Sequence, residues 1–135
     1  MKVTNTREDR SKKVLTLPPE RFDSYFDYYV YIHLNTDVVI LHCVGMLLGF
    51  FFLALAIIKM SWVYLVLHLL TFNLIPLVSH WIYDGLMTPT ASGAPFISIW
   101  YAIRINMWYL TGRQKRIEQK FIEKYPFVEK YFRSK

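Results

Sequence analysis

The distribution of charge along the chain constrains its fold more than any other feature. Over residues 38–83, a stretch of 46 residues, Lys59 is the only side chain with a formal charge. Uncharged segments over 38–58 and 62–83 lie on either side of it, with a turn of three residues between them. At about 1.5 Å per residue, each segment is long enough to cross a hydrocarbon core of about 30 Å. We therefore predict an all-α membrane protein built on an antiparallel hairpin of two spans.

Three further segments flank this hairpin. Six of the fourteen residues from 20 to 33 are Phe or Tyr, which favours an interfacial aromatic helix over 20–34 after a polar basic segment over 1–19. Residues 96–110 are apolar but too few for an ordinary span, so we predict a short re-entrant or interfacial helix, with a short third span as the alternative. Residues 113–135 form a basic amphipathic tail.

The basic residues predict the topology. The chain carries 16 Lys and Arg against 10 Asp and Glu, a net charge of +6. Six of the basic residues lie within 1–21 and eight within 113–135, and cytoplasmic flanks of spans are usually the basic ones. Two spans place both flanks, and so both termini, on the cytosolic or matrix side. We infer that these basic residues orient the chain in the lipid bilayer and contact its anionic headgroups. We predict no nucleic-acid partner, because no basic recognition module lies outside the apolar segments.

Small and polar residues interrupt the two spans. Gly45 and Gly49 give the first span a small-xxx-small face on which another helix can pack closely. Asn73 lies inside the second span, and Pro76 predicts a kink there. His68 lies in the half of the hairpin near the turn, and we predict that it packs against the partner helix or faces another subunit.

Ionisable residues inside apolar segments are costly, and each is therefore a candidate functional residue. His42 lies 18 residues before the turn and His80 lies 20 after it, so their depths in the hairpin agree to within about 3 Å. Asp84 follows His80 by four positions, on the same helix face. A chain break at residues 35–37 would allow His33 to fold back towards them. We therefore predict that His33, His42, His80 and Asp84 converge at the end of the hairpin that carries the termini.

Three imidazoles and one carboxylate are a suitable ligand set for a divalent metal ion. With open coordination positions this set suits the oxygen chemistry of Fe(II), and zinc is the competing ion. The alternative is that these histidines lie at the membrane interface and bond to headgroups, water or tyrosine hydroxyls. The sequence contains no nucleophile elbow, phosphate-binding glycine loop or zinc-protease motif that would indicate another enzyme class.

The order of these residues also resembles a known family. Tyr29, His33, Asn35 and His42 form a Tyr-x-x-x-His-x-Asn pattern with a second His nine positions after the first, and His80 and Asp84 form a later His-x-x-x-acid pair. Pro95 and Ser98 then give Pro-x-x-Ser before the last aromatic helix. This arrangement, over about residues 22–112, is similar to that of the small membrane proteins related to the 2-hydroxy fatty acid dioxygenase of α-oxidation.

The resemblance implies an iron-dependent enzyme of the endoplasmic-reticulum membrane that uses O₂ to shorten a 2-hydroxy acyl chain by one carbon. It implies His33, His42 and His80 as metal ligands, with Asp84 where the family has Glu. Val38 and Ser79 stand where the family has Asn and Gly. These departures are those of a diverged member, and such a member can retain the fold without the activity.

A second hypothesis comes from a different functional class. A small hairpin with long charged flanks is also typical of a non-catalytic accessory subunit that holds other membrane subunits in a larger complex, for example in the mitochondrial inner membrane. Such a subunit requires no metal. The metal content of the purified protein distinguishes the two hypotheses.

Overall fold

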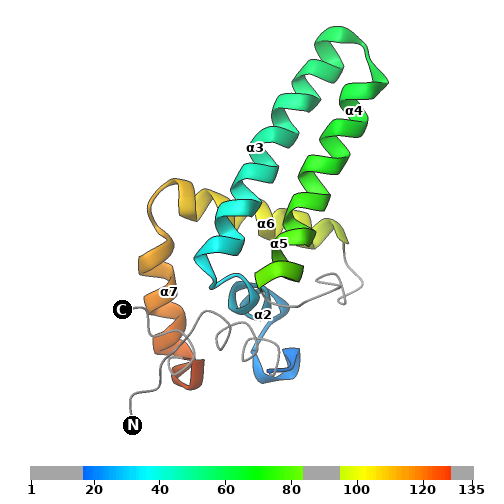
Figure 1. Ribbon diagram of the computed structural model, residues 1–135. Coiled ribbons are helices and arrows are strands. Elements are labelled where there is room, and N and C mark those ends of the chain that lie inside the picture. Colours follow the sequence, from blue (N-terminus) through cyan, green and yellow to red (C-terminus); the bar gives the residue numbers. More distant parts are fainter. Residues whose placement is uncertain (1–16, 84–94, 129–135) are drawn as a thin grey trace.

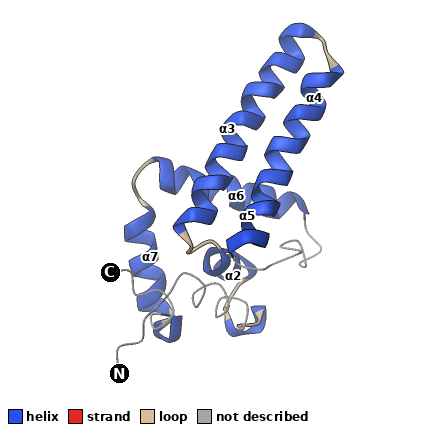
Figure 2. Ribbon diagram, viewed as in Figure 1, coloured by secondary structure: helices blue, strands red, loops and turns tan. Residues whose placement is uncertain are grey.

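The computed structural model describes residues 17–83 and 95–128, and within these ranges the protein is helical, with no strand (Figure 2). A hairpin of two long helices rises from a base of shorter helices, with α2, α6 and α7 all at the base (Figure 1). This arrangement confirms the predicted all-α hairpin with flanking aromatic helices.

The first hairpin helix, α3, covers Thr36–Lys59. The second runs from Trp62 to Tyr83 as three consecutive pieces: α4 (Trp62–Leu69), a π-helical turn η2 (Leu70–Leu74) and α5 (Ile75–Tyr83). At about 1.5 Å per residue, both exceed the thickness of a hydrocarbon core. The structure therefore has two helices long and apolar enough to span a membrane.

The sequence explains where α3 begins and ends. The Asn35 side chain accepts a hydrogen bond from the Asp37 N–H at 3.0 Å and so caps the first turn, as its residue type favours. At the other end, Met60 adopts a left-handed conformation with φ of 49°, and the Ser61 N–H reaches back to the Ala56 carbonyl. The chain therefore reverses within the predicted turn.

The outer surface of the hairpin is apolar. Each hairpin helix contains an 18-residue apolar stretch. In α3, 39% of this stretch is buried, and in the helix Trp62–Tyr83 only 6% is buried. Large side chains are exposed on both helices, among them Phe51, Ile58, Trp62 and Leu69. A core helix of a water-soluble domain buries most of such a stretch, whereas this hairpin presents an extended apolar surface, which soluble monomers rarely do.

Two glycines set the distance between the hairpin helices. A Cβ built on Gly45 would lie 2.8 Å from the Thr71 carbonyl oxygen, and one built on Gly49 would lie 2.9 Å from the Phe72 ring. Contacts this short exclude any side chain larger than hydrogen. The helix that packs on the Gly45 and Gly49 face is therefore the second half of the same hairpin.

A π-turn interrupts the second hairpin helix at Leu70–Leu74, immediately before the predicted kink at Pro76. Proline has no N–H, so the Phe72 carbonyl cannot receive its ordinary α-helical hydrogen bond. One extra residue in the turn rotates the face of the following helix by about 100°. The π-turn therefore sets which side of α5 faces α3.

The aromatic segment differs from the predicted single helix over 20–34. A 3-10 turn at Pro19–Arg21 is followed by an extended residue, Phe22, and the α-helix α2 then covers Tyr25–Ile32. The Ser24 hydroxyl caps α2 by accepting a hydrogen bond from the Asp27 N–H at 3.1 Å. Serine at this position starts a helix more readily than it continues one, which explains the break.

Helix α6 (Pro95–Leu110) lies across the base of the hairpin, not alongside its two helices (Figure 1). It packs on α3 and on α2, where Tyr101 contacts both Phe26 and Tyr29. At 16 residues, or about 24 Å, α6 is shorter than an ordinary span. This placement favours the predicted re-entrant or interfacial helix over a third span.

The last described helix, α7 (Gln114–Lys124), docks on the segment before α2. The ring of Phe121 stacks on that of Phe22, with 6.1 Å between centroids, and the Tyr125 hydroxyl donates to Asp27 at 2.9 Å. Burial raises the pKa of Asp27, but hydrogen bonds from Lys124 and Tyr125 outweigh this effect and hold that pKa below its ordinary value. The basic tail is thus tied to the aromatic segment at the base.

We expect Gly45→Ala to destabilise the hairpin by about 1–3 kcal/mol, because the new methyl group meets a backbone carbonyl that cannot move aside. Thermal unfolding in detergent micelles, followed by circular dichroism, measures the change. Leu48→Ala, at an exposed position of the same helix, is the control. Equal melting temperatures for Gly45→Ala and wild type would contradict the close packing described above.

We expect Tyr125→Phe to destabilise the contact between α7 and α2 by about 2 kcal/mol, because its hydroxyl donates to the charged Asp27 and accepts from the Asp23 N–H. Limited proteolysis, read as the rate of cleavage after Lys124, reports the undocking of α7. Tyr109→Phe is the matched control, since the Tyr109 hydroxyl makes no hydrogen bond within residues 17–83 and 95–128. Unchanged cleavage in Tyr125→Phe would show that the aromatic packing alone holds α7.

Candidate metal centre

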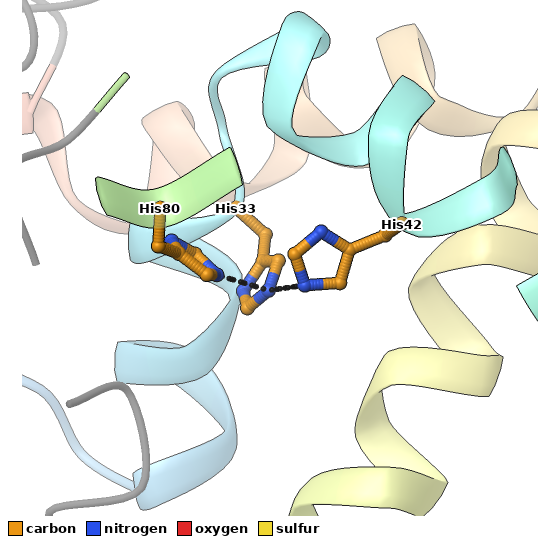
Figure 3. Close-up of side chains that lie close together, drawn as sticks. All are labelled: His33, His42 and His80. Atoms are coloured by element: carbon orange, nitrogen blue, oxygen red, sulfur yellow. Dashed lines mark hydrogen bonds between the residues drawn. The ribbon is translucent and has the colours of Figure 1, made fainter. Parts of the chain in front are cut away.

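Three histidines from three different helical segments meet at the base of the hairpin (Figure 3). His33 follows the last residue of α2, His42 lies in the second turn of α3, and His80 lies in α5. All three are buried, with 3%, 4% and 1% of their surfaces exposed respectively. His33 and His42 are 9 positions apart in the sequence, and His42 and His80 are 38 apart, yet all three imidazole rings share one small volume.

The ring nitrogens of these residues point towards one another, with His33 between the other two (Figure 3). The Nε2 atom of His33 lies 3.2 Å from that of His42 and 3.2 Å from that of His80. All three candidate ligand atoms lie within 4.8 Å of one another. The rings stand nearly perpendicular, at 83° to 89° to each other, so that their edges converge.

Backbone contacts determine which nitrogen of each ring carries the proton. The Nδ1 atom of His33 lies 2.7 Å from the Tyr29 carbonyl oxygen, and that of His42 lies 2.8 Å from the Val38 carbonyl oxygen. A carbonyl oxygen only accepts, so each Nδ1 must carry the hydrogen. In the neutral rings both Nε2 atoms are therefore unprotonated and can only accept a hydrogen bond. Two such atoms 3.2 Å apart cannot hydrogen-bond to each other.

A metal ion suits this arrangement. Ligand nitrogens about 2.1 Å from a shared ion lie about 3.0 Å apart at an angle of 90° and about 3.4 Å apart at a tetrahedral angle. The separations of His33 Nε2 from His42 Nε2 and from His80 Nε2, both 3.2 Å, fall between these values. The ligand atoms of His42 and His80 lie within 4.8 Å of each other, so these two rings would move closer around a shared ion. Histidine ligands of metals usually donate their other N–H to a carbonyl or carboxylate, as His33 and His42 do here. The donor set therefore fits a divalent cation.

The surroundings keep His33 neutral. Its ring is stacked on that of Tyr29, with 4.2 Å between centroids, and Tyr29 is itself 5% exposed. Burial holds the pKa of His33 well below its ordinary value, and the neighbouring His80 and His42 lower it further. A neutral imidazole is the form that binds a metal.

Asp84, the fourth predicted ligand, lies outside the described residues. His68 lies away from the cluster: its Nδ1 hydrogen-bonds to the Gly49 carbonyl at 2.9 Å and its ring contacts Phe72. This is the packing against the partner helix that the sequence predicted as one of two possibilities. Asn73 is exposed and its amide donates to the Leu69 carbonyl, within its own helix.

Two further residues touch the cluster, and their roles were not predicted. The sequence places Tyr29 in the aromatic segment and in the Tyr-x-x-x-His pattern without predicting its contact with His33, although a residue four positions before His33 lies one helical turn away. Ser79 is fully buried, with its hydroxyl 3.4 Å from His42 Nδ1 and 2.7 Å from the Pro76 carbonyl. Only the pairing of α3 with α5 brings Ser79 to His42, and no local sequence pattern reports that contact.

The fold and the site together define a class: small helical proteins with a hairpin of span length and a buried triad of histidines at its base. Residues 20–114 match the family described as 2-hydroxy-palmitic acid dioxygenase Mpo1-like. The match covers most of the chain, including all three histidines, and the protein belongs to this family. No curated protein and no solved structure gave a significant match.

We expect the purified protein, loaded anaerobically with Fe(II), to retain stoichiometric metal after desalting, and His42→Gln to lose it. Glutamine removes the imidazole lone pair while keeping a polar side chain of similar size. Elemental analysis of the desalted protein measures the metal. His68→Gln is the matched control, because His68 lies in the same hairpin but outside the cluster. Metal retained by His42→Gln at the wild-type level would exclude the histidine triad as the binding site.

Proposed function

We propose that the protein is a membrane-embedded, iron-dependent dioxygenase that removes one carbon from a 2-hydroxy fatty acid. The observation that carries this proposal is the convergence of three buried imidazoles, two of which have their Nδ1 atoms bonded to carbonyls and their Nε2 lone pairs directed inward. Family membership supports the reaction class, since the family is described by a 2-hydroxy-palmitic acid dioxygenase.

Membrane insertion is supported by the exposed apolar surface of α3 and of the helix Trp62–Tyr83. A hydrocarbon environment removes the cost of exposing side chains such as Phe51 and Ile58 to water. The histidine triad lies at the end of this hairpin, because His42 is near the start of α3, His80 near the end of α5 and His33 directly after α2. The carboxyl head of a bound fatty acid would lie at the triad while its acyl chain stayed in the apolar layer.

His33, His42 and His80 would hold the metal, and the carboxylate of Asp84 is a further proposed ligand. Bound iron would supply the activation of O₂, which a protein side chain cannot perform. The chain itself orients the ligands: the Tyr29 and Val38 carbonyls hold two imidazoles in the correct tautomer. Tyr29, stacked on His33, excludes water from one side of the site.

The proposed reaction balances without another reductant. A 2-hydroxy acid and O₂ give the fatty acid one carbon shorter, carbon dioxide and water. The bond between C1 and C2 breaks, C1 leaves as carbon dioxide, and C2 is oxidised from an alcohol to a carboxylic acid. These changes release four electrons, which reduce one molecule of O₂. The 2-hydroxyl group is required for this balance, because C2 of an unsubstituted fatty acid is more reduced. Its conversion to the same products would release six electrons, two more than one molecule of O₂ accepts.

We expect the iron-loaded protein in detergent or nanodiscs to consume O₂ with 2-hydroxypalmitate and not with palmitate, and to form the acid with fifteen carbons. An oxygen electrode and mass spectrometry of the extracted lipids measure both. We expect His80→Gln to lose activity by more than about 100-fold, beyond the 10- to 100-fold typical of losing an outer-shell partner. His68→Gln is expected to retain it.

The competing function, an accessory subunit of a membrane complex, predicts a different result. Such a protein binds no stoichiometric iron, turns over no 2-hydroxy acid, and is recovered from native membranes within a larger assembly. That combination would refute the dioxygenase proposal while leaving the fold and the family unchanged.

A further inference from the structure

Arg104 is a charged residue on an otherwise apolar surface. It lies on α6, whose exposed side chains include Ile97, Trp100, Met107 and Leu110. Positions 97, 100, 104 and 107 are spaced three or four residues apart, so they form one stripe along the helix. Arg104 is the only charged residue of α6, and it is itself exposed.

Two aromatic rings hold the guanidinium group of Arg104. Its Cζ atom lies 4.7 Å from the centroid of the Phe26 ring and 5.2 Å from that of the Trp108 ring. These contacts orient a cation but do not neutralise it. Within the part of the chain that the structure describes, the ion pairs link Lys124 to Asp23 and Asp27, and none involves Arg104. The positive charge is thus positioned by the fold without a carboxylate partner there.

The place of α6 in the fold indicates what faces this charge. Helix α6 crosses the base of the hairpin and packs on α3 (Figure 1). The exposed side chains of α3 are largely apolar, like the stripe of α6. Exposed basic residues lie just beyond it, at Arg113, Lys115 and Arg116. An apolar stripe with Trp and Arg, bordered by further basic residues, is the composition of a helix at the membrane–water boundary.

We propose that Arg104, held between Phe26 and Trp108, binds the phosphate group of an anionic phospholipid in the surrounding leaflet. A planar guanidinium can donate two parallel hydrogen bonds to phosphate oxygens while its face stays on an aromatic ring. The apolar neighbours Trp100 and Met107 would contact the acyl chains of the same lipid. This site is separate from the histidine triad and requires neither metal nor activity, although it rests on the proposed insertion of the hairpin into a membrane.

Native mass spectrometry of the iron-free protein in detergent tests the proposal. Equal amounts of phosphatidylserine and phosphatidylcholine are added, and the bound lipids are counted. We expect the wild type to retain phosphatidylserine in preference to phosphatidylcholine and Arg104→Gln to reduce that preference about fivefold, the effect of one basic residue near an anionic surface. Arg113→Gln, the same substitution at a neighbouring exposed arginine, is expected to keep the preference.

Three results would overturn this site. Equal preference in Arg104→Gln and wild type would show that Arg104 does not bind the lipid, and equal losses in Arg104→Gln and Arg113→Gln would show diffuse attraction to the basic surface. Displacement of phosphatidylserine by millimolar inorganic phosphate would assign the position to free phosphate instead.

If Arg104→Gln loses helical circular dichroism, Arg104→Lys replaces it. Lysine keeps the charge but has no planar guanidinium group to stack on an aromatic ring, so we expect an intermediate preference. A wild-type preference in a folded Arg104→Lys would exclude the role of the two rings.

Discussion

The close approach of the two hairpin helices at Gly45 and Gly49 is the contact on which the rest of the structure depends. At these positions a backbone carbonyl and an aromatic ring occupy the space that a side chain would need. In a hydrocarbon layer, helices gain little from burying apolar side chains against each other, and packing at short range becomes the main attraction. The hairpin can therefore close tightly without losing its apolar outer surface.

This contact also determines the chemistry at the base. Gly45 lies three residues beyond His42 on α3, and opposite Gly45 lie Thr71, Ile75 and Pro76, a turn or more before His80. The π-turn at Leu70–Leu74 then adjusts the face of α5. Packing of one helix on another, and one irregular turn, bring His80 within reach of His33 and His42. A wider separation would move the His80 imidazole away from those of His33 and His42, and the three ring nitrogens would no longer converge.

Much of the fold could be predicted from local patterns. The uncharged segments around Lys59 predicted two helices of span length, and the observed helices Thr36–Lys59 and Trp62–Tyr83 agree with this to within two residues at each end. The depth argument also predicted that His42 and His80 lie at the same level. The break between Pro19–Arg21 and α2 was not predicted, because the aromatic periodicity continues across Ser24, and the capping preference of serine opposes it there.

The residue pattern alone established a helical hairpin of span length. It also established that His42 and His80 lie at the same depth in that hairpin. Both follow from hydrophobic length and rise per residue, which are local properties. The convergence of His33 with His42 and His80 was also predicted, from a chain break at residues 35–37. Only the tertiary structure decided that the Nε2 atom of His33 lies 3.2 Å from that of His42, and that Arg104 lies against two aromatic rings. These facts depend on the direction in which α2 and α6 leave the hairpin. Directions of this kind arise from packing between distant segments, which periodicity does not encode.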